Sequence, residues 1–559
     1  DDDDDQEAGQ WNLRKSSAAG LDVMSTVFGA EILPVMMPVV ERRLVDPDWR
    51  VRESAILAIG AVAEGCMAGL MPQLPTILSF LLPLLQDPRP LVRSITCWTL
   101  SRFSKFVVEA GSTAPPGAGN PLDTLITGLL ERAVENNKRV QQAACSAFAT
   151  LEEEALEALE PRLDFILKHL MFAFSKYGKK NLRILYDALR TLTESVGPVL
   201  GEPAHLQQLL PPLIAKWQSL GDGDRELLPL LECLTAVVSV LGSSFIDYTE
   251  PVFMRCIRIV QTQMQLLGLE QKGVMSEAGE YDRDFVVCAL DLLSGIADGI
   301  GPSVESLVGR TRLVGDMLLA CCDNPAADVR QSAFALLGDL AKSCPAHLQP
   351  HLRECITLCA KNVELLAGRV MRNEETRGDV MSACNNACWA AGELSYKVPQ
   401  EEIKPYAMLV AQHIFAIMGA ADHPSVNRNM TENCAITLGR LGWVCPAELA
   451  PHMQYFMVPW CRALRRIRDD LEKEHAFLGL CAMVRANPAG ALASFVEMCL
   501  AISSWRHIRQ EGLGGTLRNE IGAVLQMFKT ELTSRNQWAQ AFGMVDPAAK
   551  EKLTAMYGL

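Results

Sequence analysis

The chain has 559 residues, too many for one compact core, so its length predicts several domains or one extended array of repeats. Hydrophobic residues make up 49%, charged residues 21% and aromatic residues 6%, and this balance favours helix over sheet. The net charge of −14 argues against a nucleic-acid backbone as the partner and favours a basic ligand.

The N-terminus consists of the acidic run DDDDD, and the first residue is not methionine. We therefore expect the chain to begin inside a longer protein. The most apolar window, MPQLPTILSFLLPLLQ (71–86), is cut by three prolines. It is too short to span a bilayer, so no membrane insertion is predicted.

A pattern of about forty residues recurs along the chain. DPDWRVRESA begins at Asp46 and DPRPLVRSIT at Asp87, and NNKRVQQAAC (136–145) and NPAADVRQSA (324–333) follow the same plan. Each is a short polar turn followed by a helix rich in small residues, with a Leu- and Pro-rich helix upstream. Two helices per unit are typical of HEAT or armadillo-type solenoids. The prediction is an all-α HEAT-repeat solenoid of about thirteen antiparallel helix pairs sharing one continuous core.

The segment SITCWTLSR (94–102) carries two apolar stripes if it is helical. Ile95, Trp98 and Arg102 fall on one stripe, whereas Leu100 and Phe103 fall on the other, with Val92. The slot of Trp98 is filled in other repeats by Ala19, Leu57, Trp389 and Ile436, and the slot of Arg102 by Asp339 and Glu393. One position per second helix therefore faces a shared surface, which in solenoids is the usual binding face. That these are ordinary core residues remains the alternative for each position.

Single carboxylates stand within apolar helical segments of successive repeats. Asp187 and Glu194 are seven residues apart on one stripe, and Glu232, Asp291 and Asp339 are each surrounded by apolar residues. A lone carboxylate among core residues is costly unless it is paired or faces solvent. These five predict a negative channel suited to Arg and Lys of a ligand. The alternative is that each pairs with an Arg of a neighbouring repeat.

The cysteines and histidines give no metal or catalytic site. The 18 cysteines include several inside apolar helices, which predicts packing roles and a reducing compartment. His347, His351 and Cys355 are spaced by four, but Pro350 interrupts that helix and a fourth ligand is missing. No cofactor is predicted.

Two further motifs receive structural interpretations. GLGGT (512–516) lacks a preceding strand, so it does not predict a phosphate loop, and no protease, hydrolase or kinase motif occurs. The sequence therefore predicts a protein that is not an enzyme. The run RALRRIRDDLEKE (462–474) predicts a solvated helix with internal ion pairs.

Several long motifs, in order over nearly the whole chain, resemble the transportins, the karyopherin-beta-2 family of nuclear import receptors. They are SITCWTLSR, VQQAACSAFATLEEEA, LPLLECL, VRQSAFALLGDLAK, ACNNACWAAGE and NCAITLGRLGWVCP. The resemblance implies that residues 1–10 are the remnant of that family's acidic loop. It implies that residues 11–559 form a continuous C-terminal cargo-binding solenoid, the N-terminal repeats being absent.

The resemblance also implies a site for nuclear localisation signals of the proline–tyrosine class, which are disordered, basic peptides ending in Arg…Pro-Tyr. The Pro-Tyr end would meet Ala19, Asp22, Leu57, Ile95, Trp98 and Arg102. The Arg and central part would meet Ala143, Glu153, Asp187, Thr191 and Glu194. The upstream stretch would meet Glu232, Asp291, Asp339, Asn385, Trp389, Asn433 and Ile436. Gln142 stands where the family more often has a carboxylate.

The resemblance further implies partners and localisation. RanGTP would act mainly through the absent N-terminal repeats and release cargo, and nucleoporin Phe-Gly repeats would also bind. The protein would be a monomer that shuttles between cytoplasm and nucleus without direct contact to nucleic acid. The alternative is a HEAT-repeat scaffold subunit that assembles folded partners, similar to a phosphatase scaffold.

Overall fold

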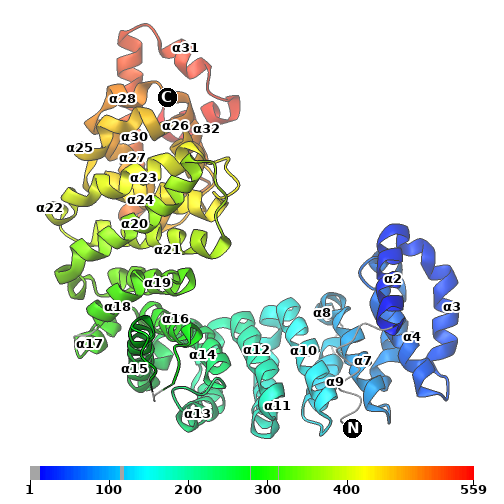
Figure 1. Ribbon diagram of the computed structural model, residues 1–559. Coiled ribbons are helices and arrows are strands. Elements are labelled where there is room, and N and C mark those ends of the chain that lie inside the picture. Colours follow the sequence, from blue (N-terminus) through cyan, green and yellow to red (C-terminus); the bar gives the residue numbers. More distant parts are fainter. Residues whose placement is uncertain (1–12, 114–118, 277–278, 312–313) are drawn as a thin grey trace. The chain divides into compact units, whose positions relative to one another are not determined.

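The computed structural model describes residues 13–113, 119–276, 279–311 and 314–559. This part of the chain contains α-helices and short 3-10 helices but no β-strand (Figure 1), as the sequence predicts. The chain divides into two compact units, unit 1 up to Phe245 and unit 2 from Ile246. The expected continuity of one solenoid over 11–559 stays a prediction, and the proposed acidic remnant, 1–10, lies outside the described residues.

Unit 1 is a row of helix pairs. Its helices are α2 (Leu13–Phe28), α3 (Leu33–Leu44), α4 (Trp49–Val62), α5 (Met67–Leu70), α6 (Leu74–Leu84), α7 (Pro90–Ser101), α8 (Ser104–Ser112), α9 (Pro121–Ala133), α10 (Lys138–Ala155), α11 (Leu163–Lys176), α12 (Lys179–Val196), α13 (Pro203–Ser219) and α14 (Leu227–Leu241). The first helices of the pairs, the A helices, are α3, α6, α9, α11 and α13. The second helices, the B helices, are α4, α7, α10, α12 and α14, and each packs against the next.

Unit 2 repeats the same arrangement. Its helices are α15 (Ile246–Gln271), α16 (Arg283–Ile300), α17 (Glu305–Val308), α18 (Val314–Cys322), α19 (Ala327–Ser343), α20 (Leu352–Met371), α21 (Gly378–Lys397), α22 (Gln400–Ile403), α23 (Ala407–Gly419), α24 (Arg428–Val444), α25 (Pro446–Leu449), α26 (Met453–Leu464), α27 (Leu471–Ala486), α28 (Pro488–Leu492), α29 (Phe495–Ser503), α30 (Gly512–Ser534), α31 (Trp538–Gly543) and α32 (Pro547–Tyr557). Its A helices are α15, α18, α20, α23, α26 and α29, and its B helices are α16, α19, α21, α24, α27 and α30. The described residues thus form eleven pairs, with α2 before them and α31 and α32 after, against the expected thirteen or so.

The recurring Val-Arg motif links neighbouring repeats. Arg52 donates through Nη1 to the carbonyl of Asp46, 2.8 Å away, and through Nη2 to Asp87 Oδ2 of the next turn, 2.7 Å away. Arg93 does the same one repeat later, bridging the carbonyl of Asp87 to Glu135 Oε1 at 2.8 Å. The polar residues of each turn therefore accept hydrogen bonds from the preceding repeat, which explains why the repeat is visible in the sequence.

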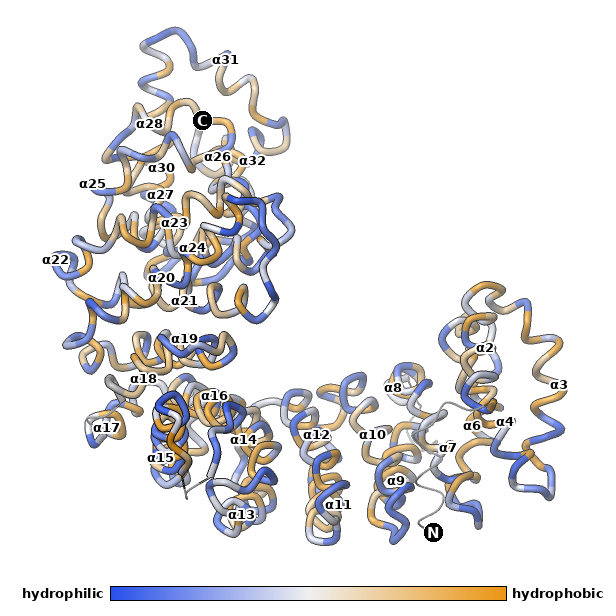
Figure 2. Tube along the Cα trace, viewed as in Figure 1, coloured by the Kyte–Doolittle hydropathy of each residue, from blue (hydrophilic) through white to orange (hydrophobic). Residues whose placement is uncertain are grey.

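Buried apolar side chains between the helices form the core. Figure 2 shows helices striped with hydrophobic and hydrophilic residues, the pattern of amphipathic helices. All 18 cysteines are buried and free, so their predicted packing role is confirmed. Burial raises the pKa of the Cys97 thiol to about 12, which keeps this thiol protonated.

Among the residues that the structure describes, four stretches are long and apolar enough to cross a membrane, by length and composition alone: Leu13–Leu44, Met67–Leu84, Leu227–Gln271 and Arg283–Val308. Each is broken in the structure. Gly29, Gly242 and Gly301 have positive φ and end helices in three of them, and the 3-10 helix Met71–Gln73 interrupts the fourth. Such breaks are typical of connections between packed helices.

The prediction of one solvated helix over 462–474 is wrong. The run crosses from the end of α26 to the start of α27, and Lys473 and Glu474 are buried, with 1% and 2% exposure. Lys473 Nζ lies 2.8 Å from Asp469 Oδ1, and Glu474 pairs with Arg509 at 2.5 Å. The acidic half of the run therefore enters a buried, ion-paired turn, in which Lys473 and Glu474 each meet an opposite charge.

Candidate functional site

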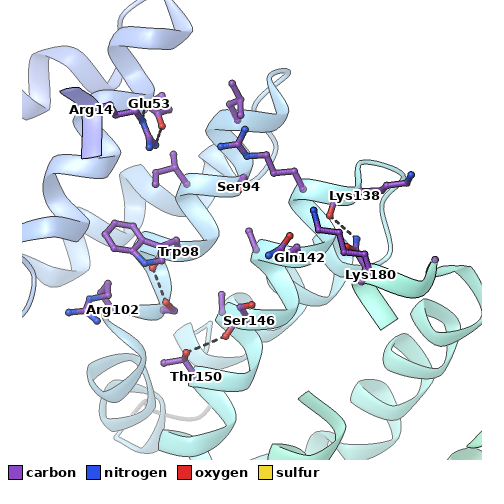
Figure 3. A pocket seen from close by; sticks show the side chains of 18 of the residues that line it. Arg14, Glu53, Ser94, Trp98, Arg102, Lys138, Gln142, Ser146, Thr150 and Lys180 are labelled. Carbon is purple, nitrogen blue, oxygen red and sulfur yellow. Dashed lines mark hydrogen bonds and ion pairs between the residues drawn. The ribbon is translucent and has the colours of Figure 1, made fainter. Parts of the chain in front are cut away.

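A groove with a volume of about 910 Å³ lies along the B helices of unit 1. It is lined by α4, α7 and α10, by the start of α12 and by Arg14 of α2, and we call it the unit 1 groove. Four of the predicted contact residues line it: Ile95, Trp98, Arg102 and Ala143. Figure 3 shows Trp98 and Arg102 on one side of this groove and Lys138 and Lys180 on the other.

The ring of Trp98 packs against a glycine of the preceding B helix, and we call this packing position its seat. A Cβ atom placed on Gly60 of the preceding B helix would lie 2.3 Å from Trp98 Cζ3, so the ring rests on the backbone of α4. The next residue, Thr99, is buried and donates a hydrogen bond to the carbonyl of Ile56 at 3.1 Å. Trp98 nevertheless remains 38% exposed, so one part of the ring packs and another is open to a ligand.

The other residues expected around the Pro-Tyr end are placed differently. Ala19 is half-buried and Asp22 is exposed, both on α2, and Leu57 is half-buried on α4. None of the three lines the unit 1 groove. Arg102 pairs with Glu64 Oε2 at 2.6 Å, an exposed contact that leaves the guanidinium partly accessible.

The carboxylates predicted for unit 1 are exposed. Glu153 lies at the end of α10, and Asp187 and Glu194 lie on α12, where the half-buried Thr191 donates to the carbonyl of Asp187 at 3.0 Å. Glu232 is exposed on α14. Within the described residues, Glu153, Asp187 and Glu194 form no ion pair, so pairing with a neighbouring Arg does not account for these three.

Glu152, beside Glu153, differs from these exposed carboxylates. It is fully buried, and within the described residues neither carboxylate oxygen has a hydrogen-bond partner. Burial, and to a lesser degree the nearby Glu153, raises the pKa of Glu152 well above its usual range. The buried surroundings therefore favour the neutral, protonated form of this carboxyl.

Trp389 in unit 2 has a seat like that of Trp98. A Cβ on Gly338 of the preceding B helix would lie 2.0 Å from Trp389 Cζ3. Trp389 Nε1 donates to Glu472 Oε1 of α27 at 3.3 Å. The two tryptophans that the register pairs thus both pack over a glycine of the preceding repeat.

Glu393, which aligns with Arg102, does not face outward in the repeat of Trp389. Glu393 is buried at 3% exposure and forms an ion pair with Arg440 at 2.8 Å. Arg440, itself 1% exposed, also reaches Glu472 Oε1 at 3.2 Å. The expectation that Glu393 shares the face of Trp389 is therefore wrong, because the charge is neutralised inside the helix packing.

The remaining predicted residues of unit 2 are partly accessible, with one exception. Asp291, Asn385 and Asn433 are half-buried, and Asn433 Nδ2 donates to Asn385 Oδ1 at 3.0 Å, joining α24 to α21. Ile436 is buried, with 3% exposure.

Asp339 is half-buried on α19 and has a shifted pKa. It accepts a hydrogen bond from Ser294 Oγ at 2.5 Å. Burial raises the pKa of Asp339 to about 6, and the Ser294 hydrogen bond opposes that rise. The carboxyl therefore titrates close to physiological pH.

Sequence reasoning missed the cations of the unit 1 groove and the two seat glycines. The groove is also lined by Lys138, Arg139 and Lys180. The comparison of repeats in the sequence considered apolar and acidic positions and therefore did not include these basic residues. A search for small residues opposite each tryptophan would have found Gly60 and Gly338, since a large ring needs space in the adjacent helix.

No metal site is found within the described ranges, where no three His, Cys, Asp or Glu side chains lie close enough to hold an ion. His347 lies in the 3-10 helix Pro345–His347 and His351 in the 3-10 helix Gln349–His351, before α20 begins. The spacing with Cys355 therefore does not form one helical face, as Pro350 predicted.

Comparisons with known proteins fit this geometry. Residues 49–103 match the family model described as HEAT-like repeat. The chain is 50% identical to transportin-1 of Oryza sativa subsp. japonica over 100% of its length, and 43% identical to transportin-1 of Homo sapiens over 98%. It is 34% identical over 98% to importin subunit beta-2 of Schizosaccharomyces pombe (strain 972 / ATCC 24843). The chain spans 60%, 58% and 57% of these relatives, respectively.

Solved structures share the fold at low sequence identity. Importin beta in an ammonium sulfate condition aligns with a TM-score of 0.57 and 16% identity, covering 86% of this chain and 60% of that one. The structure of Kap95p with RanGDP aligns with a TM-score of 0.53 and 16% identity, covering 86% and 61%. These similarities confirm the predicted HEAT-repeat solenoid.

Proposed function

Because this chain is homologous to the transportins along nearly its whole length, we propose that it is part of a nuclear import receptor, a transport protein rather than an enzyme. Its cargo would be nuclear localisation signals of the proline–tyrosine class. The observation that carries this proposal is the unit 1 groove, where Ile95 and the partly open ring of Trp98 line one cavity. Such a surface suits an aromatic residue and a proline.

The exposed carboxylates support a basic ligand. Glu153, Asp187 and Glu194 lie on α10 and α12, two of the helices that contribute to the groove, and within the described residues they are not neutralised by ion pairs. Arg and Lys of a disordered signal would bind them through charge-assisted hydrogen bonds. In unit 2, Asp339, Asn385 and Trp389 are accessible enough to bind the upstream stretch of the signal. A disordered ligand needs such separated anchors, since each one offsets part of its ordering cost.

The further partners and the localisation are proposed from the similarity to the relatives. RanGTP would release cargo through repeats that this chain does not contain, as supported by the fold that it shares with Kap95p, which is described bound to Ran. Nucleoporin Phe-Gly repeats would bind as well, and the monomeric receptor would shuttle between cytoplasm and nucleus. No direct contact with nucleic acid or insertion into a membrane is proposed.

The decisive experiment is a calorimetric titration of this chain with a synthetic basic peptide ending in Arg…Pro-Tyr. We expect saturable binding to the wild-type chain. Trp98→Ala should weaken it at least about thirtyfold, the loss typical of a buried aromatic hot spot. Phe172→Ala is the matched control, because Phe172 is 54% exposed on the A helix α11, outside the groove. No saturable binding by the wild type, or equal losses in both variants, would overturn the proposal; binding of folded partners instead would favour the scaffold alternative.

A further inference from the structure

The unit 1 groove contains a basic cluster that a basic signal does not explain. Lys138 and Arg139 form the first turn of α10, and Lys180 lies in the first turn of α12. Asn181 Nδ2 donates to the carbonyl of Lys138 at 2.8 Å, which holds these two helix starts together. Figure 3 shows Lys138 and Lys180 next to each other, beside Gln142.

The three cations differ from the others in the groove because they have no partner in the described residues. Arg14 pairs with Glu53, and Lys179 pairs with Glu226. No carboxylate of the described residues forms an ion pair with Lys138, Arg139 or Lys180. In a chain of net charge −14, these three cations gather on one wall of a cavity. Like charges that line the same cavity repel one another, and an anion bound among them lowers that repulsion.

The opposite ends of the same helices are acidic. Lys138 begins α10 and Glu153 lies near its end, and Lys180 lies in the first turn of α12 while Glu194 lies near its end. The positive ends of the helix dipoles add to the basic wall. An extended peptide directs successive side chains to opposite sides, so an Arg can point toward the acidic ends of these helices while its neighbour points toward the basic wall.

We infer that Lys138, Arg139 and Lys180 form a subsite for an acidic side chain, Asp or Glu, of the same peptide whose aromatic residue packs on Trp98. Neighbouring helices pack about 8–10 Å apart, so α10 and α12 lie roughly 10 and 20 Å beyond α7. An extended chain advances about 3.3 Å per residue. The acidic residue therefore lies about three to six residues before the Pro-Tyr pair. This inference rests on the proposed function and adds a preference that a generally basic signal would not have.

The test compares two peptides that end in Pro-Tyr, both with amidated C-termini so that the terminal carboxylate is absent. They differ at one position, four residues before the Pro-Tyr pair, which holds Glu in one and Gln in the other. We expect the wild-type chain to bind the Glu peptide about three- to tenfold more tightly, and the ratio to shrink as salt rises from 50 to 300 mM.

The variants of the chain are compared by the ratio of the dissociation constants for the Gln and Glu peptides. The combined variant Lys138→Ala, Arg139→Ala, Lys180→Ala should bring the ratio of the two dissociation constants to about one. The control removes the same charge from exposed residues outside the groove: Arg42→Ala, Arg43→Ala, Lys105→Ala. It should keep the wild-type ratio, because these residues lie outside the groove. Since both variants lose the same charge, a difference between them reports the contacts inside the groove and not the long-range field of the protein.

The outcomes separate the two proposals. If both peptides bind but the wild type shows no preference for Glu, or if the preference survives in the groove variant, the acidic subsite is refuted while the receptor proposal stands. If neither peptide binds saturably, the proposed function fails and the subsite fails with it.

Discussion

The seat of Trp98 predicts that a single methyl group in the neighbouring helix controls peptide binding. In Gly60→Ala the new Cβ would meet Trp98 Cζ3 at 2.3 Å and Thr99 Oγ1 at 2.8 Å, whereas ordinary contacts begin near 3.4 Å. Thr99 is held in the core, so the ring has to move by about 1 Å or more. Because the ring is already 38% exposed, it can tilt into the groove, and the cost in unfolding free energy stays near the lower end of about 1–3 kcal/mol.

The same tilt fills the space that a ligand would use. We expect the affinity of a Pro-Tyr peptide to fall about tenfold in Gly60→Ala, which corresponds to about 1.4 kcal/mol of binding free energy. Titration calorimetry measures the affinity, and urea denaturation measures the stability. Gly20→Ala on α2 is the matched control, since nothing lies within 4 Å of its new Cβ. It should keep wild-type affinity and slightly stabilise the helix.

A double-mutant cycle sharpens the test. In a Trp98→Ala background the ring is gone, so Gly60→Ala should cost no further affinity. Wild-type affinity of Gly60→Ala, or an equal loss in both backgrounds, would show that the glycine does not act through Trp98 and would refute this reasoning.

Three further predictions concern other parts of the chain. Gly338→Ala should displace Trp389 in the same way and weaken a long signal more than a short Pro-Tyr peptide, as calorimetry with peptides of two lengths would show; equal losses would contradict it. Glu152→Gln should stabilise unit 1 at pH 8. A carboxyl whose pKa is raised in the folded state contributes fully to the free energy of unfolding below its unfolded pKa, and this stability is lost as pH rises through the folded pKa. Its advantage in thermal unfolding should narrow toward pH 4.5, and a constant advantage would count against the buried neutral carboxyl. Affinity for a basic, histidine-free peptide should fall as pH drops from 7.5 to 5, because Asp339, with a pKa of about 6, becomes neutral; Asp339→Asn should lose that dependence, and a variant that keeps all of it would exclude this carboxyl as the cause.

The repeat architecture was predictable because its connections are made by residues that recur in the sequence. Arg52 and Arg93 each link their own turn to the next, so the same polar letters return about every forty residues. The stripe of Ile95, Trp98 and Arg102 was predictable for a similar reason, since one helical period fixes which residues share a face. All three line the unit 1 groove.

The exceptions arise where tertiary packing reverses the local pattern. Glu393 occupies a slot that is solvent-facing in the repeat of Arg102, yet Arg440 from the next B helix draws it into the interior. Lys473 looks like a surface charge in its run but is enclosed by a turn that the run itself forms. Arg440 is far in sequence from Glu393, and Asp469, although only four residues from Lys473, lies in the turn before α27, so a single-helix argument detects neither burial.

The buried Arg440 has a mechanical consequence for unit 2. Its guanidinium reaches Glu393 on α21 at 2.8 Å and Glu472 on α27 at 3.2 Å, so one side chain on α24 joins the B helices on either side. A solenoid bends through small rotations at each junction between repeats. Rotation at these two junctions would pull a desolvated charge from its partner, which is more costly than sliding apolar surfaces past each other. The stretch from α21 to α27 should therefore move as a stiff block, and the elastic bending of unit 2 should concentrate at the junctions outside it.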